Sequence, residues 1–216
     1  QSDTHVAAKQ WQIDDIRVAF FMKGYRAMDD VLAYLEQEKV YFATWAASPN
    51  YTVNKKFIVS DANTFNLWHN IEESRKTFIS LMPSMRIVET LKVKKQLGTA
   101  LYNRVKAEIL SGTISTDIAN VLELLQPAVV KWTIMKAIDE KILTIMHDGL
   151  YVRNSKADFF SNREKLKTDA QERQYLRDAV EKDAESFIVE LKNYLNTTAT
   201  ATVLPEYFND ASVYVA

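Results

Sequence analysis

The most apolar stretch of the chain runs from Val129 to Met146 and reads VVKWTIMKAIDEKILTIM. Its apolar side chains wrap most of the circumference of a helix, and a helix that is apolar nearly all round belongs in the centre of a bundle. We expect this helix to follow Ser115, to continue or divide at Pro127, and to reach Met146. The stretch therefore predicts an all-α fold, a multi-helix bundle with a central apolar helix.

The residues around this stretch also favour helices over strands. Gly and Pro number only 4 each in 216 residues, whereas sandwiches and barrels need many of them at their corners. The turn signal Asp148-Gly149 allows at most one short strand or β-hairpin near residues 148–153. The expected helix boundaries are the N-caps Ser60 or Asp61, Ser74 and Ser115, and the helix ends Gly98 and Gly112.

Two further long helices are predicted, from about Gln12 to Gln37 and from about Glu164 to Asn196. The first carries apolar residues at three- and four-residue spacing, which we expect to be buried. They are Ile13, Ile16, Phe20, Tyr25, Met28, Val31, Leu32 and Leu35. The alignment that lays Ile16 on Leu176 also lays Met28 on Ile188, Val31 on Leu191 and Leu35 on Leu195. Either any two amphipathic helices align this well, or each helix closes one repeat unit.

The repeat interpretation divides the chain into three parts. Residues 1–59 would be the closing helix and linker of a first repeat unit, whose body would lie outside this chain. Residues 60–196 would form the helical bundle domain, and residues 197–216 an extended C-terminal tail.

Composition and charge narrow the classes of function. A net charge of −1 gives no bulk attraction to nucleic acid or to anionic membranes. The chain has no cysteine, which removes disulfides and thiolate chemistry. No apolar run reaches the roughly 18 to 20 residues of a membrane span, so no membrane partner is expected.

The residue patterns of common catalytic and ligand sites are missing from the sequence. The four glycines are isolated, whereas phosphate-binding loops need them clustered. The three histidines lie far apart, and none follows a glutamate at the spacing of a helical metal site. Adjacent acids such as Asp29-Asp30 point about 100° apart on a helix and cannot easily share a proton. We therefore expect no catalytic residue, no cofactor and no metal, and we do not expect an enzyme.

Two sets of residues are candidates for surface contacts. The first is a basic cluster that could meet phosphates or an acidic partner, or could simply be a solvated helix face. It contains Lys92, Lys94, Lys95, Arg104 and Lys106. The second is a group of aromatic residues in the expected connection and tail, which could dock on a neighbouring subunit or fold back over the bundle. It contains Tyr41, Phe42, Trp45, Tyr51, Tyr207, Phe208 and Tyr214.

Several short segments together resemble an uncharacterised all-α family that is encoded in phage-like gene clusters of bacteria. They are KGYRAMD (23–29), WAAS (45–48), SRKTF (74–78), LMPSMR (81–86) and QLG (96–98). The resemblance runs over nearly the whole chain, and it implies an additional N-terminal unit. These segments are mostly packing residues, so they indicate kinship and not activity. A more distant similarity, at the level of fold, is to head–tail connector (head completion) proteins of tailed phages.

The resemblance implies a non-enzymatic structural or adaptor protein of a phage or phage-like particle, which assembles in the bacterial cytoplasm. As a head–tail connector it would form a homo-oligomeric ring and contact portal or tail components. The alternative is a small cytoplasmic helical module that binds protein or nucleic acid through the basic face around Lys92–Lys106.

Overall fold

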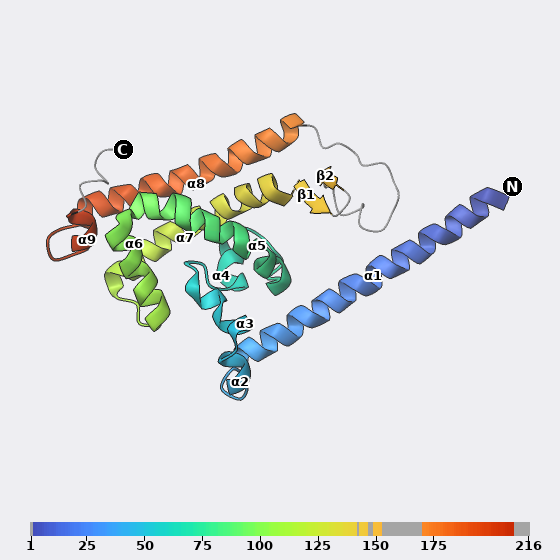
Figure 1. Ribbon diagram of the computed structural model, residues 1–216, viewed down its shortest axis with the longest axis horizontal. Helices are drawn as coiled ribbons and strands as arrows, with labels where there is room; N and C mark the ends of the chain where they lie inside the picture. The colour runs from blue at the N-terminus through green and yellow to red at the C-terminus, as the bar shows by residue number, and fades with distance from the viewer. Residues whose placement is uncertain (1, 142, 147–148, 153–169, 210–216) are drawn as a thin grey trace.

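The computed structural model describes residues 2–141, 143–146, 149–152 and 170–209, and this part of the chain is an all-α bundle with one small hairpin (Figure 1). The elements in chain order are α1 (Ser2–Gln37), α2 (Ala43–Ala46), α3 (Pro49–Thr52), the 3-10 turn η1 (Asn54–Lys56), α4 (Ala62–Trp68), α5 (Arg75–Val88), the π-helical turn η2 (Glu89–Val93), α6 (Lys94–Ser111), α7 (Thr116–Lys141), β1 (Leu143–Met146), β2 (Gly149–Val152), α8 (Ala170–Thr198) and α9 (Pro205–Phe208). No helix in these ranges is both long enough and apolar enough to cross a membrane.

The body of the protein is organised around the long pair α7 and α8, which run antiparallel along each other (Figure 1). Helices α5 and α4 also pack against α7. The side chains of Leu125 and Val129 in α7 are fully buried, as are those of Leu191 and Leu195 in α8. Burying a side chain of this size stabilises the fold by about 1.5 to 3 kcal/mol. The α7–α8 contact is thus a large part of the hydrophobic core.

The predicted helix boundaries at Asp61, Ser74 and Gly112 are confirmed, whereas Gly98, which was predicted to end a helix, lies inside α6 at a kink with φ at 75°. The Asp61 carboxylate accepts from the Thr64 amide at 2.8 Å and begins α4, and the Ser74 hydroxyl accepts from the Thr77 amide at 3.2 Å and begins α5. Gly112 ends α6 in the left-handed region, with φ at 74°. Glycine alone adopts this conformation without strain.

Helix α7 follows one of the two alternatives predicted at Pro127 and differs from its prediction at its C-terminal end. Pro127 lies inside one continuous helix and does not divide it. The helix ends at Lys141, and the apolar run continues as β1, which pairs with β2 in an antiparallel hairpin. The reason is that the Asp148-Gly149 turn signal lets the last apolar residues pair with residues 149–152.

The C-terminal segment differs from the predicted extended tail. Helix α8 continues to Thr198, and the chain then turns into α9. Leu204 is 0% exposed and Tyr207 is 1% exposed, so this segment packs back on the body. Its apolar side chains are buried because α9 lies against α6. Residues 210–216 lie outside the described part of the chain.

Helix α1 leaves the body as a long arm (Figure 1). Its 36 residues span about 54 Å at 1.5 Å per residue. Only the C-terminal part of the arm lies near the body, where it contacts α5. The core itself begins with Phe57, Ile58 and Val59, at the end of the segment predicted as a linker.

Candidate interaction surface

The arm exposes the apolar face that its sequence pattern defines. Ile13 and Ile16 are each 56% exposed, and Phe20 is 69% exposed. Met28 and Val31 continue the same side of the helix toward the body, at 44% and 58% exposed. We call these five residues the α1 stripe. The expectation that they are buried was wrong for the chain by itself, because no described element covers them.

The attachment of the arm explains why the stripe stays in solvent. The Asp29 carboxylate accepts from the Lys76 backbone amide at 3.1 Å, and Glu36 pairs with Arg75 at 3.1 Å. The Lys76 ammonium lies 2.9 Å from the centre of the Tyr25 ring. At 100° per residue, these contacts lie roughly 140° around the helix from the stripe. Helix α5 therefore covers the polar side of α1.

A shallow hollow of about 470 Å³ lies on the arm, and its lining is almost entirely apolar. It is lined by Arg17, Phe20, Gly24, Tyr25 and Met28. A Cβ atom added at Gly24 would meet nothing within 4 Å. The hollow therefore exists because a residue without a side chain sits between the large residues of the stripe.

The aromatic residues predicted in the connection gather just after α1. Phe42 contacts Tyr34 of α1 edge to face, with ring centres 5.9 Å apart, and Tyr41 is 82% exposed. Trp45 of α2 and Tyr51 of α3 form a second pair at 5.9 Å and are partly buried. Tyr41 and Phe42 thus extend the exposed apolar surface from the C-terminal end of the arm.

The aromatic residues predicted in the tail differ in how far their side chains are exposed. Tyr207 follows the alternative in which the tail folds back over the bundle, because its ring is buried and its hydroxyl donates to the Asn196 side chain at 3.0 Å. Phe208, the next residue, is 46% exposed. Tyr214 lies outside the described residues.

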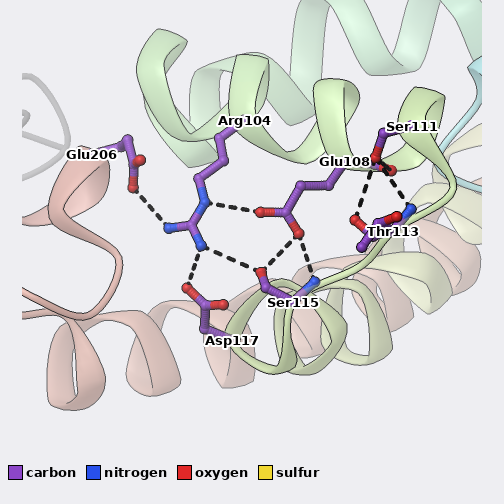
Figure 2. A network of polar contacts seen from close by, with 7 residues as sticks. All are labelled: Arg104, Glu108, Ser111, Thr113, Ser115, Asp117 and Glu206. Atoms are coloured by element: carbon purple, nitrogen blue, oxygen red, sulfur yellow. Dashed lines mark hydrogen bonds and ion pairs between the residues drawn. The ribbon is translucent and has the colours of Figure 1, made fainter.

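Arg104 is held inside a polar network that joins three helices, as Figure 2 shows. Its guanidinium donates to Glu108 at 3.0 Å, to Asp117 at 2.7 Å and to Glu206 at 3.1 Å. Glu108 lies on α6 with Arg104, Asp117 begins α7 and Glu206 lies on α9. The network therefore clamps the segment that follows α8 onto the body.

The network shifts the acidity of its members. Burial raises the pKa of Glu108, but hydrogen bonds from Ser115 and Arg104 outweigh it and hold this pKa below its usual value. The pKa of Asp117 is also lowered: burial raises it, and hydrogen bonds from Ser115 and Arg104 outweigh that effect. Burial lowers the pKa of Arg104, but its hydrogen bonds to the three acids outweigh burial, so that this pKa lies above its usual value. All of these shifts favour the charged forms.

Lys106 and Glu89 form a second polar contact, which lies deeper. Their side chains pair at 2.6 Å, and the Ile58 amide donates to the other oxygen of Glu89 at 2.6 Å. Lys106 also donates to the backbone carbonyl of Lys56. Burial raises the pKa of Glu89, and the contacts with Lys106 and Ile58 offset part of that rise. Glu89 opens the π-helical turn η2.

The basic cluster is consequently not a uniform positive face. Lys92 pairs with Glu181 at 3.4 Å and lies over the Trp132 ring, 5.0 Å from its centre. Arg104 and Lys106 are paired as described above. Lys95 is exposed and Lys94 is partly buried. Three members of the predicted cluster are thus engaged within the chain.

The described residues contain no group of three or more His, Cys, Asp or Glu side chains that could hold a metal ion. The α1 stripe is a candidate contact surface that was not predicted from the sequence. Its residues were treated as packing residues because their spacing resembles that of any buried helix face. The sequence similarity between the first and last long helices could have indicated this surface. It shows that α1 has the apolar pattern of a helix that packs against a partner.

The fold and this surface together define an all-α protein with a compact helical body and a projecting helical arm. The chain belongs to a family of unknown function (DUF6712), whose family model matches residues 1–55 and 93–213. The matched ranges include α1, α6, α7, α8 and α9. No curated protein and no solved structure matches the chain.

Proposed function

We propose that this chain is a non-enzymatic structural or adaptor protein of a phage or phage-like particle, a head–tail connector that forms a homo-oligomeric ring. It would assemble in the bacterial cytoplasm and contact portal or tail components. The observation that carries the proposal is the arm, which presents a row of apolar side chains outside the body. Exposed apolar rows of this kind are typical of surfaces that other proteins cover.

The packing of the body supports the same proposal. The arm is attached to α5, which packs against α7, and α7 in turn shares a fully buried contact with α8. An adaptor needs such a base, because an arm can transmit its position to a neighbour only if its own attachment is ordered. The exposed aromatics Tyr41, Phe42 and Phe208 offer additional contact area.

The experiment is native mass spectrometry of the purified full chain, alone and with the portal and tail proteins encoded beside its gene. We expect a closed assembly of more than two copies, and a stable complex with at least one of these proteins. A chain that stays at one or two copies at high concentration and binds none of them would contradict the proposal.

The alternative, a module that binds nucleic acid through the Lys92–Lys106 face, has less support. The acidic partners of Lys92, Arg104 and Lys106 already neutralise most of that face. Affinity for duplex DNA that falls steeply between about 50 and 200 mM salt would favour it, since phosphate contacts release counterions.

A further inference from the structure

We propose that the α1 stripe is the binding surface for the α1 helix of a second copy of this chain, with the two helices antiparallel. The inference goes beyond the proposed place in a particle, because it concerns the purified chain by itself. It rests on the exposure, spacing and charges of residues in α1.

The first argument is the spacing of the exposed residues. Residues at alternating three- and four-residue steps form the line along which two helices pack in a coiled coil. On α1 this line consists of Ile13, Arg17, Phe20, Gly24, Ala27, Val31 and Tyr34, all of which are exposed. Ile16 and Met28 flank it. Five of these seven residues are apolar or aromatic, and no described element covers the line.

The second argument is that the line is complementary to itself when reversed. With a two-fold axis between Gly24 and Ala27, each Gly24 lies opposite the Ala27 of the other copy. The small residues let the two backbones approach closely at the centre of the pair. In the same register, Phe20 lies opposite Val31 of the other copy, next to the hollow beside Gly24.

The third argument is charge. Lys23 and Asp30 are one heptad apart and lie exposed on one flank of the line. An antiparallel pair brings the same flank of both helices together. Lys23 of each copy then comes within reach of Asp30 of the other, and Arg17 comes to lie against the Tyr34 ring of the other copy. A parallel pair would not bring Lys23 near Asp30.

The area of the contact lies near the lower limit for a specific interface. In this register about 24 residues of each arm overlap, or about 36 Å at 1.5 Å per residue. A strip of that length and about 10 Å wide covers roughly 360 Å² in projection per copy, and the accessible area that it buries is larger. Specific interfaces begin near 1,000 Å² in total. We therefore expect a dimer that dissociates on dilution.

The position of the body at one end of the arm separates the two bodies in this pair. Each body lies at the C-terminal end of its own arm, so an antiparallel pair places the two bodies at opposite ends (Figure 1). The polar side of the arm that contacts α5 through Asp29 and Glu36 stays engaged. A symmetric contact of this kind closes at two copies. A ring would need further contacts between copies in addition to this one.

The first test is sedimentation equilibrium of the full chain and of the F20D variant. Two Phe20 side chains leave the pair and two charges enter it, so we expect self-association at least about a hundredfold weaker. The matched control is L67D, which places the same charge at an apolar residue of α4 that is 76% exposed. L67D should associate like the unaltered chain, and both variants should keep its helical circular dichroism.

The second test exchanges the flanking charges. K23E and D30K should each weaken self-association several-fold, since each places like charges opposite one another twice per pair. The double variant K23E/D30K should restore it. Lys23 and Asp30 are two helical turns apart in one copy, so the rescue reports a contact between copies.

The outcomes separate this inference from the proposed function. A chain that is monomeric at about 1 mM, an F20D variant that associates as well as L67D, or a double variant without rescue would each overturn the antiparallel pair. A closed ring that F20D leaves unchanged would support the connector and overturn the pair. A dimer that F20D dissolves, without any larger assembly, would support the pair and contradict the ring.

Discussion

Helices α1 and α8 carry the same apolar pattern and use it differently. Leu191 and Leu195 of α8 are 0% exposed, because α7 covers them. Val31, which the internal alignment lays on Leu191, is 58% exposed. Gly24 corresponds in the same way to Ala184, which is fully buried. One helix has its partner within the chain, and the other presents its pattern to solvent.

The difference shows what a periodic pattern specifies. It specifies that a helix forms and which side of the helix is apolar, because both follow from the local sequence. It does not specify the partner, because the partner is a matter of tertiary arrangement. We therefore expect the same kind of substitution to lower the free energy of unfolding strongly in α8 and hardly at all in α1.

The largest difference is expected for truncation of the two aligned residues. L191A should lower the free energy of unfolding by about 2 to 5 kcal/mol, since it leaves a cavity between α8 and α7. V31A should change it by less than about 0.5 kcal/mol, since its side chain is already in solvent. Urea denaturation at low protein concentration measures both. Equal effects would mean that the arm is covered by its own chain.

Much of the body could be predicted from the sequence for the same local reason. The caps at Asp61 and Ser74 and the left-handed Gly112 are each set by one residue and its near neighbours. The end of α7 could not be predicted, because residues 143–146 are as compatible with a helix as with a strand. Their pairing with residues 149–152 decides the matter.

The next effect compares an arginine that is clamped within the body with an arginine that is exposed on the arm. R104A should destabilise the protein by about 1 to 3 kcal/mol, because three partly buried acids on α6, α7 and α9 lose their shared donor. R17A on the exposed side of the arm should be neutral within about 0.5 kcal/mol. Thermal or urea unfolding of both variants makes the comparison. An R104A variant that is as stable as R17A would mean that the Arg104 network does not stabilise the fold.

A pH dependence follows from the same clamp. The pKa values of Glu108 and Asp117 are lowered in the folded protein, so the folded state holds their protons less tightly than the unfolded state. Their stabilising effect is present above about pH 4, the unfolded range, and is lost as the pH falls through the folded values. Unfolding measured from about pH 6 to pH 3 should show a loss of stability that is smaller in R104A. A loss of equal size in both proteins would point to other acids.

The candidate surface was harder to predict than the body. The basic residues Lys92, Arg104 and Lys106 looked like one patch because they are close in sequence. Their partners, Glu181, Glu206 and Glu89, come from elements that only the fold brings near. A cluster of basic residues is visible within one segment of the sequence. An ion pair needs a second residue, which lies on another element and which only the fold brings near. A sequence therefore suggests more unpaired charge than the folded protein has.

The smallest effect is expected at the attachment of the arm. Arg75 and Glu36 form a partly exposed ion pair, which contributes about 0.2 to 1 kcal/mol. R75A should therefore leave global unfolding nearly unchanged, yet hydrogen exchange should become faster near the end of α1, since that end loses one of its few contacts with α5. R177A in α8 is a suitable arginine control in the other helix, because Arg177 pairs with Asp139 of α7 at 3.4 Å. Because α8 is held by a buried apolar face, a change at one ion pair should not loosen it, whereas α1 has no fully buried side chain among those described. Unchanged exchange in R75A would mean that Asp29 and Tyr25 suffice to hold the arm.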